Sequence, residues 1–406
     1  MNKTIFKLLN LKKLFRFNKI DLLNLSQIEQ FFALAISYNP KRFDKEINKK
    51  FDLIGDQKIW EFAKNERSES IISNTLIDVL NKKGISNRWL LSSKEIGEKI
   101  KLYMQELDYL ASELKKINIQ IIALKNSGIA RGIFKNYSAS PMGDIDVLVN
   151  PEDFYEAHKQ MIKLGYEFSD RSPFAIKNVH EAFEHGGAEY ICKLPNGKKL
   201  WIELQWRPVA GRWIQPSQEP SVSDLFKNSI PIKGSCCRLL SPEDNLLQVC
   251  LHTAKHSYVR SPGFRLHTDV DRIVSHYEID WEKFYKKVVS LKVRTPVYLS
   301  LLIPKMLLKS EVPKIILEKL NFSPFKHSLL QSWLLKVGLF SPEEKKWNRF
   351  GYIFFNLLLF DDFFDLFKAV FPDSNYLKKN SYKKNFLFFI YLNRIFSLLF
   401  NRSKNT

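Results

Sequence analysis

Hydrophobic residues recur with a helical period through the first part of the chain. The clearest stripe alternates steps of four and three residues, at Ile96, Ile100, Tyr103, Leu107, Leu110 and Leu114. This spacing places the apolar side chains on one face of a helix, and Ser92 or Ser93 would cap its start. The pattern from about Leu22 to Lys115 is helical throughout, whereas residues 1–20 are basic and amphipathic.

Beyond these helices the period changes to that of β-strands. Ile119 to Leu124 form a short β-rich run, and a helix is expected from Ile129 to Asn136. Asp144 to Val149 then read as a second strand, because polar and apolar residues alternate there. Its two faces carry Asp144, Asp146 and Leu148 on one side and Ile145, Val147 and Val149 on the other.

A hairpin gives the strongest turn signal in the sequence. Pro195-Asn196-Gly197 joins two alternating runs, Ala188 to Leu194 and Lys198 to Trp206. Within the second run, Trp201, Glu203 and Gln205 share one face, so Glu203 lies on the polar side of its strand.

Two helix starts flank this hairpin. Asn150-Pro151-Glu152-Asp153 predicts a helix that ends at Gly165, and Ser241-Pro242-Glu243-Asp244 predicts another ahead of an apolar stripe. The helical period then continues to the end of the chain. We therefore expect a helical N-terminal region over 1–115, an α/β module over 116–235 and a helical C-terminal region over 236–406.

Composition is compatible with an anionic partner but does not choose one. The 406 residues carry a formal net charge of +20, which suits a nucleotide, a nucleic acid or an acidic membrane surface. A generally lysine-rich proteome explains the same excess equally well. Four irregularly spaced cysteines favour a reducing compartment. No run reaches the ~20 apolar residues that span a bilayer, so we expect a cytoplasmic protein, soluble or peripheral to the inner membrane.

Candidate chemistry lies in the carboxylates of the two polar strand faces. Asp144 and Asp146 project the same way, about 7 Å apart along the strand, and each raises the pKa of the other. A divalent cation relieves that repulsion, and Mg²⁺ prefers such oxygen ligands. Glu203 on a neighbouring strand would complete a two-metal site. The alternative is that the Asp-x-Asp pair merely decorates an edge strand.

Three segments resemble nucleotidyltransferases of the DNA polymerase β type, and most closely a bacterial branch of largely uncharacterised members. They are Leu124-Lys125-Asn126-Ser127-Gly128, then Ser140-Pro141-Met142-Gly143-Asp144-Ile145-Asp146-Val147-Leu148-Val149, and finally Trp201-Ile202-Glu203-Leu204-Gln205-Trp206. The resemblance implies an α+β fold, with a small α/β module of mixed sheet and flanking helices embedded between helical regions.

The resemblance also implies an activity. A nucleoside monophosphate would pass from a nucleoside triphosphate such as ATP to a hydroxyl or phosphate acceptor, with two Mg²⁺ held by Asp144, Asp146 and Glu203. The triphosphate would lie beside the segment Lys125, Asn126, Ser127 and Gly128, where the backbone N–H groups at a helix start favour anions. Members of this branch often occur near polysaccharide or peptide-modification genes, which suggests a surface polysaccharide or modification pathway.

Three positions depart from the family pattern and keep other interpretations open. Asn126 stands in place of Gly, so a Cβ must be accepted there, and Asn tolerates left-handed backbone geometry. Ser140 stands in place of Arg and Gln205 in place of His. These changes bear on turnover. A nucleotide-binding regulatory or scaffold protein, or a peripheral membrane component of a glycan pathway, is therefore the alternative.

Other residues are weaker candidates. His180 matches a family histidine and would reach the site from a loop or serve in packing. His252 and His256 stand one helical turn apart, with Asp269 and Asp271 downstream, as metal ligands or as packing and phosphate-contact residues. The Phe-rich C-terminus, Phe350 to Phe371 and Phe386 to Phe400, is expected as a core layer, with membrane contact through its basic flanks as the alternative. No RNA-binding module is recognised, so nucleic acid is the less favoured partner.

Overall fold

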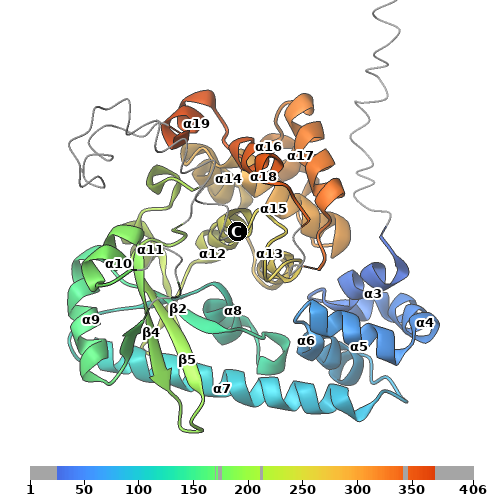
Figure 1. Ribbon diagram of the computed structural model, residues 1–406, viewed down its shortest axis with the longest axis horizontal. Coiled ribbons are helices and arrows are strands. Elements are labelled where there is room, and N and C mark those ends of the chain that lie inside the picture. Colours follow the sequence, from blue (N-terminus) through green and yellow to red (C-terminus); the bar gives the residue numbers. More distant parts are fainter. Residues whose placement is uncertain (1–24, 170, 172–175, 211–213, 342–345, 371–406) are drawn as a thin grey trace, which may run out of the picture.

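A computed structural model describes residues 25–169, 171, 176–210, 214–341 and 346–370 (Figure 1). The chain begins there with four short helices and one long one. They are α3 (Gln27–Ala35), α4 (Asp44–Ile54), α5 (Asp56–Asn65), α6 (Glu69–Asn74) and α7 (Asn87–Lys115). The amphipathic N-terminal residues 1–20 lie outside the described part of the chain, and the helical pattern that follows them is confirmed.

Helix α7 confirms the predicted stripe but begins earlier than expected. Of the six stripe residues, the five from Ile100 to Leu114 are buried. The predicted caps Ser92 and Ser93 are wrong, because both lie inside the helix, which starts after Ser86. Trp89 explains the difference: its indole N–H donates to Asp56 at 2.6 Å and its ring packs edge-on against Trp60. These contacts hold the preceding residues in helical geometry.

Seven strands form one mixed sheet in the order β3-β4-β5-β2-β1-β7-β6. They are β1 (Ile122–Leu124), β2 (Asp144–Leu148), β3 (Glu167–Ser169), β4 (Gly187–Lys193), β5 (Lys199–Gln205), β6 (Ile230–Pro231) and β7 (Arg238–Leu239). The β1–β7 and β2–β5 pairs are parallel and the other pairs are antiparallel. The expected α+β class, with a mixed sheet flanked by helices, is confirmed, and so is the β4–β5 hairpin.

Two local predictions in this region need correction. The helix expected from Ile129 to Asn136 is α8 (Lys125–Ile133), which follows β1 without a loop. Strands β6 and β7 were not predicted, because a two-residue strand shows no alternation that a sequence pattern could reveal. Since β7 reaches Leu239, the sheet extends past the proposed boundary at residue 235.

The sheet has two different faces. Ile145, Val147 and Val149 pack with α7 and with α9 (Phe154–Lys163), which follows a short 3₁₀ turn and ends just before Gly165 as expected. Leu148 packs on the opposite side, where α11 (Val222–Asn228) contributes Leu225. The polar face carrying Asp144 and Asp146 is therefore turned away from α7. Helix α10 (Val179–His185) precedes the hairpin.

The rest of the described chain is helical. Its elements are α12 (Pro242–Lys255), α13 (Arg265–His276), α14 (Trp281–Ser290), α15 (Arg294–Leu307), α16 (Lys314–Leu320), α17 (Pro324–Val337), α18 (Arg349–Leu357) and α19 (Phe363–Val370). Ser241 caps α12 as predicted, accepting a hydrogen bond from the backbone N–H of Asp244. Of the helices in the described ranges, none is both long and apolar enough to cross a bilayer.

The N-terminal and C-terminal helices share one hydrophobic core. The Phe32 ring on α3 contacts Phe264 at 6.2 Å and Phe340 at 6.0 Å between ring centroids. Figure 1 shows α3 to α6 beside the C-terminal helices, with the sheet to one side. Helix α7 runs beneath the sheet and the N-terminal helices. The α/β module is therefore an insertion between two halves of one helical body.

The Phe-rich region is only partly a core layer. Phe355 is buried and stacks on Trp333 with ring centroids 3.9 Å apart. Phe350, Phe363 and Phe364 expose more than half of their surface, so the expectation that this region forms core is wrong for them. The run from Phe386 to Phe400, and with it the suggested membrane contact through basic flanks, lies outside the described residues.

Candidate active site

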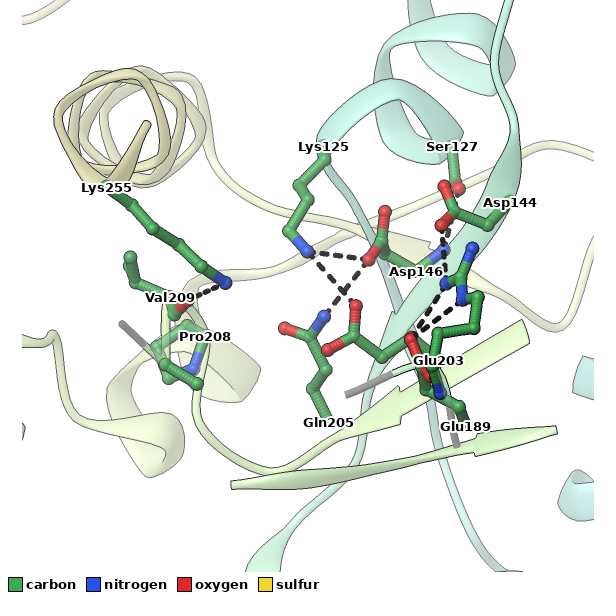
Figure 2. Close-up of polar contacts among 12 residues, drawn as sticks. Lys125, Ser127, Asp144, Asp146, Glu189, Glu203, Gln205, Pro208, Val209 and Lys255 are labelled. Carbon is green, nitrogen blue, oxygen red and sulfur yellow. Dashed lines mark hydrogen bonds and ion pairs between the residues drawn. The ribbon is translucent and has the colours of Figure 1, made fainter. Parts of the chain in front are cut away.

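The strand register brings the three predicted carboxylates together. Strand β2 pairs parallel with β5 so that Asp146 lies beside Glu203, and Asp144 lies beside Trp201. Paired residues on adjacent strands project to the same face. Asp144, Asp146 and Glu203 therefore form one cluster, visible in the centre of Figure 2.

A fourth carboxylate, Glu189, was missed by the sequence analysis. Strand β4 pairs with β5 so that Glu189 lies opposite Glu203. The signal was present in the hairpin, because the turn at Pro195-Asn196-Gly197 fixes which residues of the two runs face each other.

A lysine lies inside this cluster. Lys125 Nζ donates to Asp146 Oδ1 at 2.6 Å and lies 3.4 Å from Glu203 Oε2. Burial disfavours the ammonium, but the charges of Asp146 and Glu203 outweigh it and raise the pKa of Lys125. Its backbone adopts a left-handed conformation, with φ of 50°, at the point where β1 gives way to α8. That geometry was expected at Asn126, and it falls one residue earlier.

The two buried carboxylates have opposite pKa shifts. Burial, together with Asp144 and Glu203, raises the pKa of Asp146 well above its usual value, despite the opposing charge of Lys125. Burial alone would raise the pKa of Glu203 too, but Lys125 and Lys255 outweigh it and lower that pKa to about 2. Glu203 is therefore ionised at neutral pH, and Asp146 is the carboxyl that holds a proton most readily when no further cation is near.

Arg171 forms ion pairs with two further carboxylates of the cluster. Its guanidinium donates to Asp144 and to Glu189, each at 2.8 Å, and lies 4.5 Å above the Trp201 ring. Burial opposes the charged form, yet the hydrogen bonds that Arg171 donates to Glu189 and Asp144 raise its pKa. The planar guanidinium thus makes two ion pairs and a stacking contact.

The donor set fits magnesium in its chemistry. Among the described residues, the four carboxylates form ion pairs with Lys125 and Arg171, and their remaining oxygens would suit a divalent ion. The described residues contain no group of three or more His, Cys, Asp and Glu side chains already arranged to hold a metal ion. Lys125 and Arg171 would have to share these carboxylates with the ion.

The segment expected to cradle phosphate also docks α8 against the sheet. Ser127 Oγ accepts a hydrogen bond from the backbone N–H of Asp146 at 2.9 Å, and the residue is fully buried. A Cβ on Gly128 would lie 2.7 Å from the carbonyl oxygen of Ala123 on β1. Glycine is therefore required at position 128 for the close approach of α8 to β1. Of the four residues from Lys125 to Gly128, Asn126 is the one that is partly exposed.

We expect the substitution Gly128→Ala to lower the free energy of unfolding by about 1–3 kcal/mol, because the added methyl group meets backbone that cannot move aside. Urea denaturation would measure the change. Gly143→Ala is the matched control, since a Cβ there has nothing within 4 Å. Equal stability of the two variants would contradict this packing role.

The family departures differ in their contacts. Gln205 Nε2 donates to Asp146 Oδ1 at 3.0 Å, so this side chain supports a carboxylate in place of a histidine. Ser140 is buried, and its hydroxyl has no hydrogen-bond partner among the described residues. Beside it, Arg272 of α13 donates to the Ala139 carbonyl at 2.7 Å. The Arg272 guanidinium therefore lies next to position 140, where the family has an arginine, although Arg272 comes from a distant part of the chain.

The weaker histidine candidates do not join the carboxylates. The His180 ring nitrogen pairs with the Tyr155 hydroxyl at 3.0 Å, between α10 and α9. Asp269 pairs with Arg272, and Asp271 accepts a hydrogen bond from the Ser310 hydroxyl. The two aspartates therefore have partners of their own and do not combine with the histidines of α12 in a metal set.

Comparison with known proteins supports the class that the site suggests. The family model described as uncharacterised nucleotidyltransferase matches residues 57–309, which is more than half of the chain and spans the sheet and its carboxylates. The chain belongs to this family of uncharacterised nucleotidyltransferases. Comparisons with curated proteins and with solved structures gave no match.

Proposed function

We propose that the protein transfers a nucleoside monophosphate from a nucleoside triphosphate to a hydroxyl or phosphate acceptor, using two Mg²⁺ in the manner of polymerase β-type enzymes. One observation carries the proposal: the parallel register sets Asp146 beside Glu203, with Asp144 two residues along on the same face. Membership of the nucleotidyltransferase family supports the class of reaction.

The reaction is a single displacement at phosphorus. A bond forms between an acceptor oxygen and the α-phosphorus, the bond from that phosphorus to the β-bridging oxygen breaks, and pyrophosphate leaves. Bound magnesium would neutralise the triphosphate and stabilise the charge that develops on the leaving group. Asp144 and Asp146 would hold the ions. Glu203, ionised at neutral pH, would also hold an ion and take the proton of a hydroxyl acceptor.

The triphosphate is assigned to the start of α8. Backbone N–H groups in the first turn of a helix favour anions, and Asn126 is the partly exposed residue of that turn. Lys125, Ser127 and Gly128 would shape this end of the site. Arg171 is placed to exchange its contact with Asp144 for a phosphate oxygen, because its guanidinium is only half buried there.

Two measurements on the purified protein test the proposal. Calorimetry with each of the four common nucleoside triphosphates, with and without Mg²⁺, should show metal-dependent binding of at least one. A coupled pyrophosphate assay with candidate acceptors should then show release that requires both metal and acceptor. Absence of any Mg²⁺-dependent nucleotide binding would refute the enzyme proposal.

A second candidate function is nucleotide binding without turnover, as in a regulatory or scaffold protein. The observation that favours it is that Lys125 and Gln205 both donate to the same oxygen of Asp146. That oxygen is then satisfied without a metal ion. Metal-dependent nucleotide binding with no pyrophosphate release under any acceptor condition would support this candidate over the enzyme.

A further inference from the structure

A third cation approaches the carboxylates from the helical body. Lys255 is the last residue of α12, and its Nζ donates to the Val209 carbonyl at 3.1 Å. An ammonium has three N–H donors, and within the described residues this is the single hydrogen bond that Lys255 makes. Two donors are therefore available to a ligand.

The charge of Lys255 is incompletely balanced. Burial and the nearby charge of Lys125 lower its pKa, although Glu203 and Asp146 act in the opposite direction. Those carboxylates already have Lys125 as a partner. An anion beside Lys255 would supply the missing negative charge, because a partly buried ammonium is costly without one.

His252, one helical turn before Lys255, is a second unused donor. It is 9% exposed, and its ring contacts His256 edge-on with centroids 4.8 Å apart. No hydrogen bond to its ring nitrogens is found among the described residues. Burial, with His256, Lys125 and Lys255, lowers its pKa well below the usual value. The imidazole is therefore neutral and carries one N–H donor and one acceptor.

Two buried amide oxygens on the same side also lack partners. The Oε1 atoms of Gln205 and Gln248 have no hydrogen bond among the described residues. The Nε2 group of Gln248 donates to the Pro208 carbonyl at 3.2 Å, next to the residue that accepts from Lys255. Because buried polar atoms are rarely left without partners, these oxygens are suited to hydroxyl or amide donors of a ligand.

The position of Lys255 distinguishes this ligand from the triphosphate. Figure 2 shows Ser127 and Asp144 at one end of the cluster and Lys255 with Val209 at the other, with Lys125, Asp146 and Glu203 between them. The triphosphate is assigned to the start of α8, beside Ser127, whereas Lys255 lies on the opposite side of Glu203. An anion at Lys255 would therefore belong to the acceptor.

We propose that the acceptor is a phosphomonoester whose phosphate group is bound by Lys255 and His252, at the end of the site away from Ser127 and Asp144. This inference rests on the proposed nucleotidyl transfer. Lys255 and the imidazole N–H of His252 donate to the phosphate oxygens, and the free amide oxygens of Gln205 and Gln248 accept from hydroxyl groups of the same molecule. The site thus selects a phosphorylated, hydroxyl-bearing acceptor over an uncharged one.

Inorganic phosphate is the probe for this site. It would be titrated by calorimetry into the full-length protein saturated with Mg²⁺ and a triphosphate analogue with a methylene bridge between the α and β phosphorus atoms. We expect Lys255→Gln and His252→Gln each to weaken phosphate binding about tenfold or more, as loss of a charge-assisted or buried hydrogen bond does. The dissociation constant of the nucleotide analogue should change less than about twofold.

Three controls keep the result decisive. Lys314→Gln removes an exposed lysine of α16 and should leave phosphate binding unchanged. Lys255→Arg keeps the charge and should retain most of the binding, and if Lys255→Gln fails to fold, His252→Gln decides. No phosphate binding to the wild type, or a Lys255→Gln variant that loses the nucleotide and keeps phosphate, would overturn the proposal.

Failure of the underlying function gives a different pattern. If the wild type binds no nucleotide analogue, nucleotidyl transfer is refuted. Phosphate titrated into the nucleotide-free protein and into Lys255→Gln then still tests the phosphate site. Loss of binding in the variant would preserve the site, and equal binding would overturn it.

Discussion

Asp146→Asn is expected to reduce pyrophosphate release at least about 1,000-fold. The Asp146 carboxylate accepts hydrogen bonds from Lys125 and Gln205, and the proposed mechanism assigns it to magnesium. The substitution removes this carboxylate. Metal-ion stabilisation of transition-state charge is worth several kcal/mol, and about 4 kcal/mol corresponds to this factor. The measurement is the steady-state rate under saturating nucleotide and Mg²⁺.

The control for this variant is a carboxylate far from the sheet. Asp52 on α4 forms a surface ion pair with Lys82, and Asp52→Asn should retain full activity. Asn at position 146 keeps the shape of the side chain and one oxygen, so the fold should persist and circular dichroism would verify it. An Asp146→Asn variant with near wild-type turnover would refute the metal-ligand assignment.

Lys125→Met is expected to have the largest effect on stability. It leaves Asp146 and Glu203 side by side on adjacent strands without the ammonium that bridges them. Removing one partner of a buried ion pair typically costs about 3–5 kcal/mol, because the remaining charge is buried without compensation. The free energy of unfolding, measured with urea in the absence of metal, should fall by that amount.

Magnesium distinguishes this mechanism from a simple packing defect. If the two carboxylates form the metal site, Mg²⁺ replaces the missing charge, and the variant should gain more in melting temperature from the ion than the wild type does. Lys159→Met removes a lysine from an exposed pair with Glu156 and should cost at most about 1 kcal/mol, with no magnesium dependence. A loss of stability that Mg²⁺ does not relieve would contradict the charge explanation.

The sequence was sufficient to predict the candidate carboxylates because their placement depends on local periodicity. Alternation on β2 puts Asp144 and Asp146 on one face, and alternation on β5 puts Glu203 on the polar face of its strand. The hairpin turn adds Glu189 through its register. What alternation cannot predict is which strands become neighbours, so the parallel pairing of β2 with β5 required the structure.

The positions of the cations around the carboxylates were harder to predict from the sequence. Lys125 was expected to face phosphate or solvent, and its ion pair with Asp146 depends on the left-handed backbone at one residue. Arg171 and Lys255 reach the cluster from a loop and from the end of a helix, and neither lies in a motif. Long side chains from distant segments leave no periodic signal, so sequence reasoning identified three of the four acids and missed the ion pairs that they form.

The helical body that encloses the inserted sheet also constrains how the chain reaches its native state. The aromatic face of α3 packs on neighbouring helices, with Phe31 against Phe51 and Phe32 against Phe62, and Phe32 also contacts Phe264 and Phe340 from beyond the sheet. During synthesis the contacts of Phe32 with Phe264 and Phe340 can form only after the inserted sheet has emerged. Contacts between distant segments form slowly, and the unpaired apolar surface is prone to aggregation while it waits. Part of the apolar surface of the N-terminal helices thus stays uncovered until the C-terminal helices emerge, and a chaperone that covers it should raise the yield of folded protein.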